Sequence, residues 1–187
     1  MSDGYKIHKQ DGAYYLTFQV VQWVDVFSRK RYRDILVDSL NYCIEHKGLE
    51  VFAYVIMSNH MHLLARAANR DLSEVVRDFK RHTSRMILNG IKGEPESRRE
   101  WLLRIFEEAG SKLQKNTQYQ VWTHENHAEE IFSPAFTLQK IKYIHENPVR
   151  AGIVFQPEHY LYSSAGDYAG QTGLVKVEML NLHLLMI

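Results

Sequence analysis

The sequence is poor in cysteine and contains no long apolar run. Cys43 is the only cysteine of the 187 residues, so an internal disulfide is excluded. Because Cys43 falls in the apolar-periodic stretch ILVDSLNYCI, we expect a buried thiol with a structural role. No apolar run approaches the roughly 18 residues that a membrane span requires, and the N-terminal MSDGYKIHKQDG lacks the apolar stretch of a signal peptide. These absences predict a soluble, cytoplasmic protein with no membrane partner.

The numbers of positively and negatively charged residues are also nearly equal. Lys and Arg number 23 and Asp and Glu number 22, which gives a formal net charge of +1. Many nucleic-acid-binding domains are far more basic, so the overall charge does not indicate such a partner. The 45% of hydrophobic and 24% of charged residues are ordinary globular composition and predict a single domain over residues 1–187. Histidine and tyrosine are abundant instead, and both residue types take part in metal and phosphoryl chemistry.

Apolar periodicity predicts alternating strands and helices. Strands are expected at 13–23, 49–57, 60–67 and 119–123, and helices at 31–47, 71–89 and 136–146. Ser58 and Asn59 suit a tight turn that joins the second and third strands into a hairpin. This order predicts an α+β fold, a ferredoxin-like α/β sandwich in which helices pack on one face of a central antiparallel sheet.

The expected boundaries follow from glycine, proline and polar stretches. Gly48 ends the first helix, and the last helix must end by Asn147 because Pro148 disfavours helical geometry in the residue before it. The domain core is expected over about 13–155, with a helical insertion over about 91–116 that contains REWLLRIFEEAG. From Val149 onward the tail is expected to be irregular.

Two histidines flank an apolar residue in the third expected strand. Successive side chains of a strand alternate between faces, so His60 and His62 project from the same side with attachment points roughly 6.5 to 7 Å apart. Two imidazoles so placed can converge on one metal ion, while Met61 points into the core. The spacing alone is a weak signal, because both histidines can simply decorate a half-exposed sheet.

The stretch YIHENP at 143–148 places a tyrosine and an amide on one helix face. Tyr143 and Asn147 are four residues apart and share that face, whereas His145 points elsewhere. A tyrosine hydroxyl near a metal-bound phosphodiester can act as a nucleophile, and an amide oxygen one turn later can be a third metal ligand. A half-buried helix tyrosine and an asparagine that tolerates left-handed geometry at a helix end explain the same residues without any chemistry.

Four sequence blocks, in order, carry a family resemblance. They are FAYVIMSNHMHLL at 52–64, DLSEVVRDFKRHTSRMI at 71–87, YIHENPVRAGIV at 143–154 and PEHYLYSSAGDY at 157–168. With them the chain resembles the REP-associated tyrosine transposases, which are relatives of the single-tyrosine insertion-sequence transposases with a His-hydrophobe-His motif. The resemblance spans nearly the whole chain. The stretch WTHENH at 122–127 departs from it, because glutamines often follow the tryptophan in similar sequences.

The resemblance implies an α/β sandwich with a central antiparallel sheet and a set of functional residues. His60 and His62 match the metal-binding motif, Tyr143 matches the nucleophile, and Asn147 takes the place of a third polar ligand. The implied cofactor is a divalent metal ion, Mg²⁺ or Mn²⁺, and imidazole ligands favour Mn²⁺. The implied reaction is DNA strand cleavage and transfer through a 5′-phosphotyrosine intermediate.

The implied partner is single-stranded or hairpin DNA, bound by a monomer or a homodimer. Candidate DNA contacts are basic residues at or just beyond the end of the third strand, on the second helix, and directly after the tyrosine helix: Arg66, Arg70, Arg77, Lys80, Arg81, Arg85 and Arg150. A solvated helix face explains those of the second helix equally well.

Two other functions remain open at this point. One is a catalytically inactive regulator that binds hairpin DNA on the same fold. The other is a metal-dependent phosphodiesterase that activates water and uses Tyr143 only structurally. The presence of both histidines, the tyrosine and the asparagine favours the transposase.

Overall fold

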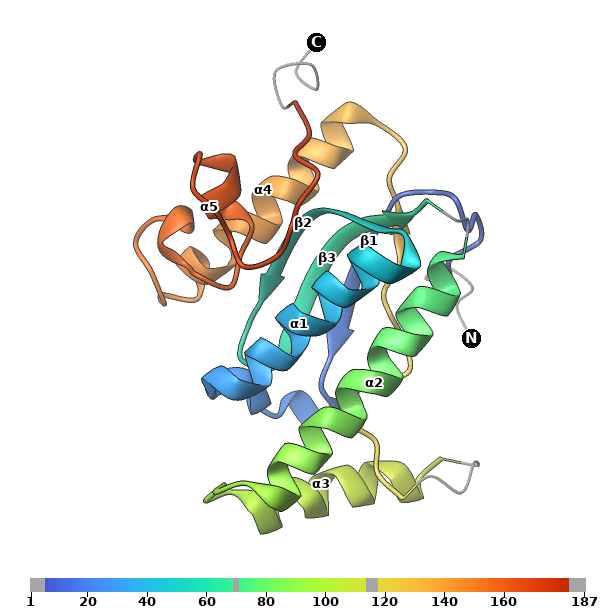
Figure 1. Cartoon of the computed structure of the whole chain (residues 1–187), viewed down its shortest axis with the longest axis vertical. Coiled ribbons are helices and arrows are strands. Elements are labelled where there is room, and N and C mark those ends of the chain that lie inside the picture. The colour runs from blue at the N-terminus through green and yellow to red at the C-terminus, as the bar shows by residue number, and fades with distance from the viewer. Residues whose placement is uncertain (1–5, 69–70, 114–117, 182–187) are drawn as a thin grey trace.

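A computed structural model describes residues 6–68, 71–113 and 118–181. Its centre is a four-stranded antiparallel sheet with the order β2-β3-β1-β4 (Figure 1). The strands are β1 (Tyr14–Gln19), β2 (Leu49–Ile56), β3 (His60–Ala67) and β4 (Glu129–Glu130). The expected α+β fold with a ferredoxin-like order of strands and helices is therefore confirmed.

Five α-helices accompany the sheet in the described residues: α1 (Lys30–Lys47), α2 (Leu72–Gly93), α3 (Arg99–Ser111), α4 (Pro134–Arg150) and α5 (Ala165–Tyr168). α1 ends at Gly48, whose φ of 65° is left-handed and costs glycine little. The Asp71 side chain accepts a hydrogen bond from the Glu74 amide and so caps the start of α2. Short 3-10 turns are η2 (Val21–Trp23), η3 (Val26–Ser28) and η4 (Pro157–His159).

The helices cover both faces of the sheet. On one face Phe18 of β1 packs against Phe79 of α2, with ring centroids 5.8 Å apart. On the other face His62 of β3 lies against Tyr143 of α4, with centroids 5.4 Å apart. Because neighbouring residues of a strand point to opposite faces, α4 lies across the sheet from α2. The expectation that the helices share one face was wrong for α4.

The strand expected at 119–123 is absent from the structure. Trp122 makes only an isolated bridge to Val20, and the fourth strand lies later in the chain at Glu129–Glu130. Trp122 is buried, and its ring packs on Phe27 at 5.4 Å. The aromatic and β-branched pattern therefore reflects burial of this segment against the core rather than a regular ladder.

Two other boundaries also differ from the sequence prediction. α4 continues through Pro148 to Arg150, because a proline in the last turn removes only one backbone hydrogen bond and the Ala151 amide still reaches the Asn147 carbonyl. β1 ends at Gln19, not at 23, because the chain turns into η2, where Gln22 and Trp23 have positive φ angles. Elsewhere β3 has the expected bounds, and Cys43 is buried as expected.

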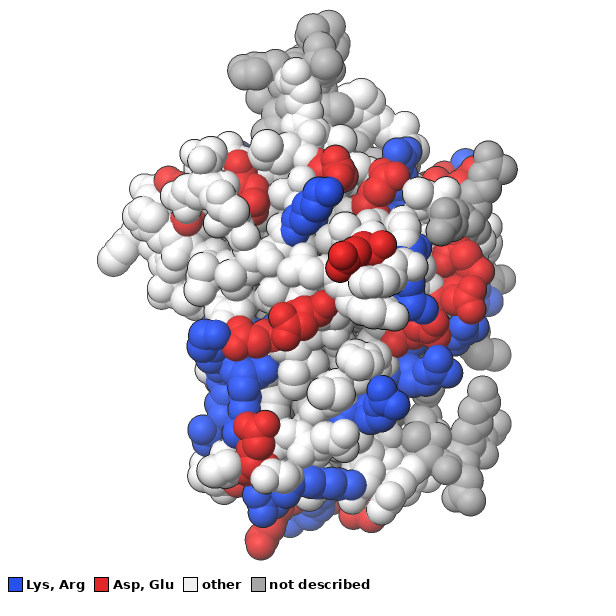
Figure 2. All heavy atoms as spheres, viewed as in Figure 1, with Lys and Arg blue, Asp and Glu red and all other residues white. Residues whose placement is uncertain are grey.

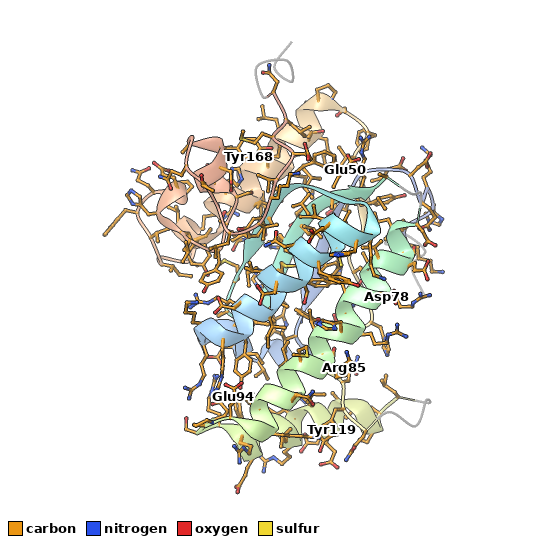
Figure 3. The ribbon with its side chains drawn as sticks, in the orientation of Figure 1. Glu50, Asp78, Arg85, Glu94, Tyr119 and Tyr168 are labelled. Atoms are coloured by element: carbon orange, nitrogen blue, oxygen red, sulfur yellow. The ribbon has the colours of Figure 1, made fainter. Side chains whose placement is uncertain are left out.

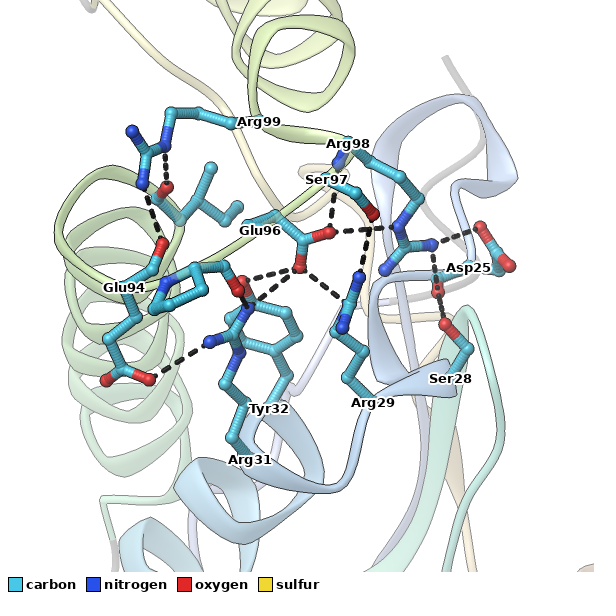
Figure 4. Close-up of polar contacts among 12 residues, drawn as sticks. Asp25, Ser28, Arg29, Arg31, Tyr32, Glu94, Glu96, Ser97, Arg98 and Arg99 are labelled. Atoms are coloured by element: carbon cyan, nitrogen blue, oxygen red, sulfur yellow. Dashed lines mark hydrogen bonds and ion pairs between the residues drawn. The ribbon is translucent and has the colours of Figure 1, made fainter.

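A buried carboxylate fastens the start of the insertion to α1. The Glu96 side chain is fully buried, and its oxygens lie 2.9 Å from Arg29 Nε, 3.0 Å from Arg31 Nη2 and 3.3 Å from Arg98 Nε (Figure 4). The Tyr32 hydroxyl donates to it at 3.1 Å. α3 follows directly, so this cluster sets where the insertion begins; residues 114–116 of the expected insertion lie outside the described part. None of the described helices is long and apolar enough to cross a membrane.

Candidate active site

The two histidines of β3 point to the same face, toward α4. Their ring centroids are 4.8 Å apart, as the alternation of the strand requires. Burial lowers the pKa of His60, and burial, followed by the nearby His60, Lys140 and Arg150, lowers the pKa of His62 to about 3. Both imidazoles are therefore neutral at pH 7, the form that binds a metal ion.

Each imidazole uses its Nδ1 atom within the protein. His60 Nδ1 lies 2.7 Å from Asn59 Oδ1, and since an amide oxygen only accepts, His60 Nδ1 is the donor. His62 Nδ1 lies 2.8 Å from the Tyr15 hydroxyl and 2.9 Å from the Thr17 hydroxyl. The proton on His60 Nδ1 leaves the Nε2 lone pair of that ring free for a metal ion. The two hydroxyls at His62 Nδ1 fix the orientation of the second ring and leave its Nε2 atom without a contact to them.

Tyr143 faces this pair from α4. Its ring lies edge-on to His62 at 5.4 Å and to Tyr15 at 6.2 Å, and 42% of the residue is exposed. The Arg150 guanidinium stacks over the Tyr143 ring at 4.2 Å and donates to the Tyr143 carbonyl at 2.9 Å. The Tyr143 ring, two neutral imidazoles and the Arg150 cation thus lie together where α4 meets the sheet, and these groups are suited to chemistry on a phosphodiester.

Asn147 lies one turn after Tyr143 on α4 and is partly exposed. Within the described residues, no group of three or more His, Cys, Asp and Glu side chains is arranged to hold a metal ion. The third ligand expected from the sequence, the amide oxygen of Asn147, is not one of these residue types and stays a prediction. His145 points away from the site, as expected, since its Nε2 lies 2.9 Å from Ser164 Oγ and its ring lies 5.0 Å from Tyr168.

Sequence reasoning missed four residues that support the site. Tyr15 and Thr17 hold His62, and Asn59 holds His60. The Lys140 ammonium lies 4.2 Å from the centre of the Tyr15 ring and pairs with Glu129 at 2.8 Å. The signal for Tyr15 and Thr17 lies only in the strand register, which pairs Thr17 with His62. Periodicity does not reveal that register.

The expected DNA contacts are divided between the two faces of the sheet. Arg150 is at the site, and Arg66 lies further along β3 on the same face, where it pairs with Glu50 at 2.6 Å. α2, which carries the other four, covers the opposite face. Arg70 lies outside the described residues.

Of the four expected DNA contacts on α2, Arg77, Arg81 and Arg85 are spaced by four residues and share one face, whereas Lys80 does not. Arg77 and Arg81 both pair with Asp78, and Arg85 lies further along the helix (Figure 3). Basic and acidic side chains alternate on this face of the molecule (Figure 2). The Lys80 ammonium turns inward and donates to the Thr123 carbonyl and to Asn126 Oδ1, both at 2.7 Å. Lys80 therefore fastens the 119–126 segment to α2, and its contacts are explained without DNA.

Comparisons with known proteins agree with this geometry. The sequence model of the family described as IS200-like transposases matches residues 10–147, which include both histidines, Tyr143 and Asn147. A solved structure of a REP-associated tyrosine transposase bound to a REP hairpin is similar with a TM-score of 0.64 and 16% identity, over 95% of this chain and 92% of that chain. At this identity the likeness shows the fold. No curated protein matches the chain.

Proposed function

The chain belongs to the IS200-like transposase family, and from that premise we propose that it cleaves and rejoins one strand of DNA through a covalent bond to Tyr143. One observation carries the proposal. The ring centroids of Tyr143 and His62 lie 5.4 Å apart, where α4 packs against β3. Because both belong to one chain, we propose a site that is built from a single copy, as a monomer or within a homodimer.

The proposed metal ligands are His60, His62 and Asn147. Two neutral imidazoles with Nδ1 engaged fit a divalent metal ion, and an amide oxygen suits Mg²⁺ or Mn²⁺ as a third ligand. When bound, such an ion offsets negative charge that develops on the scissile phosphate. Tyr15, Thr17 and Asn59 act as the groups that hold the two rings in place.

The proposed reaction begins with the Tyr143 hydroxyl. Its oxygen attacks the phosphorus in line, loses its proton, and forms a 5′-phosphotyrosine, while the bond to the 3′ oxygen breaks and that oxygen leaves as a 3′-hydroxyl. The energy of the phosphodiester is kept in the new bond, so a 3′-hydroxyl can attack it and restore both the DNA strand and the tyrosine. The proposed role of Arg150, whose guanidinium stacks on the Tyr143 ring, is to neutralise the phosphate backbone beside the attacked bond.

The proposed substrate is single-stranded DNA or a DNA hairpin. The structural relative is bound to a hairpin, and the same fold is present here. Arg66 and Arg150 are the proposed phosphate contacts on the face of the site. Arg77, Arg81 and Arg85 are proposed contacts for more distant DNA, because they lie on α2 across the sheet.

The test is a denaturing gel of protein incubated with Mn²⁺ and a labelled single-stranded hairpin. We expect a labelled protein band that EDTA abolishes and that Tyr143→Phe lacks. Tyr42→Phe is the matched control, since Tyr42 is similarly exposed but lies on α1. Binding without a covalent product would identify a DNA-binding regulator instead. Cleavage that survives in Tyr143→Phe would identify a phosphodiesterase that activates water.

A further inference from the structure

Trp23 is an exposed indole in a strained turn beside the site. It ends η2, and 58% of the residue is exposed, in contrast to the buried Trp122. Gln22 and Trp23 have φ angles of 54° and 57°, two consecutive left-handed residues that carry a Cβ. Such conformations cost free energy, persist only where the surroundings hold them, and cluster at binding sites. The side chains of Gln22 and Trp23 are themselves exposed, whereas their neighbours Val21 and Val24 are buried and hold both ends of the turn.

A single amide links this turn to a proposed metal ligand. Asn59 Nδ2 donates to the Trp23 carbonyl at 3.2 Å, and Asn59 Oδ1 accepts from His60 Nδ1 at 2.7 Å. The Trp23 amide donates to the Val20 carbonyl at 3.1 Å. The indole ring then lies edge-on to the His60 ring, with centroids 5.9 Å apart. The indole is thus held beside His60 while most of its surface stays open.

We propose that Trp23 is a stacking platform for one unpaired base of the DNA strand, next to the phosphate that Tyr143 attacks. This inference rests on the proposed function. An indole offers a flat apolar face, and any base can stack on it once it has left a duplex. Stacking at Trp23 fixes the strand at the edge of the site, so that the scissile phosphate stays near His60 and His62. The platform accordingly favours a single strand over a paired one.

The test uses single-stranded hairpins that carry the fluorescent base 2-aminopurine at one position at a time. Binding is measured with Tyr143→Phe protein, so that no covalent product forms. We expect quenching at one position beside the scissile phosphate, and its loss in Trp23→Ala. Trp23→Ala should also weaken binding about 5- to 150-fold, the range for the loss of one stacked base, and Trp23→Phe should restore most of the affinity.

Two controls separate stacking from a structural effect. Trp101→Ala removes another exposed tryptophan, on α3, and should leave affinity and quenching unchanged. The affinity for Mn²⁺ should be the same in Trp23→Ala as in the unmodified protein, because the contact of His60 with Asn59 is retained. In protein with Tyr143 intact, Trp23→Ala should raise KM for the single strand far more than it lowers kcat.

The outcomes distinguish this inference from the proposed function. If the unmodified protein neither binds the hairpin nor forms a covalent product, the proposed function fails and the inference fails with it. If it reacts, but Trp23→Ala binds as tightly as Trp101→Ala and quenches 2-aminopurine equally, Trp23 is no platform and only the inference is overturned. A loss of Mn²⁺ affinity in Trp23→Ala that equals the loss of DNA binding would likewise overturn it.

Discussion

Replacing Glu96 by glutamine should destabilise the protein in a pH-dependent way. The Glu96 side chain is fully buried among Arg29, Arg31 and Arg98. Burial alone would raise the pKa of this carboxyl, but hydrogen bonds from the Arg98 amide, Arg31 and Tyr32 outweigh it and lower the pKa to about 2. Against an unfolded value near 4.5, that shift of roughly 2.5 units corresponds to about 3 kcal/mol, because one unit is about 1.4 kcal/mol.

The direction of the pH effect follows from the lowered pKa. The Glu96 carboxyl binds fewer protons in the folded protein than in the unfolded chain. Its contribution to the free energy of unfolding is therefore complete above about pH 4.5 and is lost as the pH falls toward 2. Urea unfolding at pH 7 should give Glu96→Gln a free energy of unfolding about 3 kcal/mol lower, and the melting temperature should fall by about 6 to 12 °C. The difference should shrink as the pH is lowered from 4.5.

The matched control is Glu94→Gln. Glu94 pairs with the same Arg31 at 3.0 Å, but its side chain is 61% exposed. The free energy of unfolding of Glu94→Gln should therefore fall by less than about 1 kcal/mol. Glu96 has no such stabilising role if the two variants are equally stable at pH 7, or if the deficit in the free energy of unfolding of Glu96→Gln does not change between pH 7 and pH 3.

Two further predictions concern the metal and the DNA. Asn59→Ala should weaken Mn²⁺ binding about 10- to 100-fold, measured by calorimetry, because His60 loses the acceptor for its Nδ1 proton; an unchanged affinity would mean that the ring is held by other contacts. Arg150→Gln should reduce the slope of log affinity for DNA against log salt by about 1, whereas Lys80→Met, whose ammonium bonds to Thr123 and Asn126, should leave the slope unchanged. Equal slopes for these two variants would remove Arg150 from the DNA interface.

The fold could be predicted largely from local patterns, and the arrangement of the site only in part. The period of two in β3 places His60 and His62 on one side, and the structure has that geometry. The side on which α4 packs is a tertiary property, so periodicity did not reveal that Tyr143 approaches the histidines from the face opposite α2. The position of Pro148 in the last turn explains why the rule for proline failed there.

The roles of residues that depend on long-range contacts could not be predicted from the sequence either. Lys80 shares the helical spacing of Arg77 and Arg81, but only the course of the 119–126 segment shows that its ammonium is bound within the protein. Asn59 suits a turn on sequence grounds, and the structure gives it two further contacts, to His60 and Trp23. Both cases show that residue type and spacing identify candidates, while the partners decide what a side chain does.

Tyr143 can be tested as the nucleophile by identifying the residue to which the DNA becomes attached. Protein trapped with a single-stranded hairpin and Mn²⁺ is digested with nuclease and trypsin, and the peptides are analysed by mass spectrometry. We expect a nucleotide, joined through its phosphate, on the peptide YIHENPVR, residues 143–150, attached to Tyr143 and to none of the other tyrosines among the 11 of the chain. A modification on another tyrosine, or DNA cleavage with no modified peptide, would contradict it.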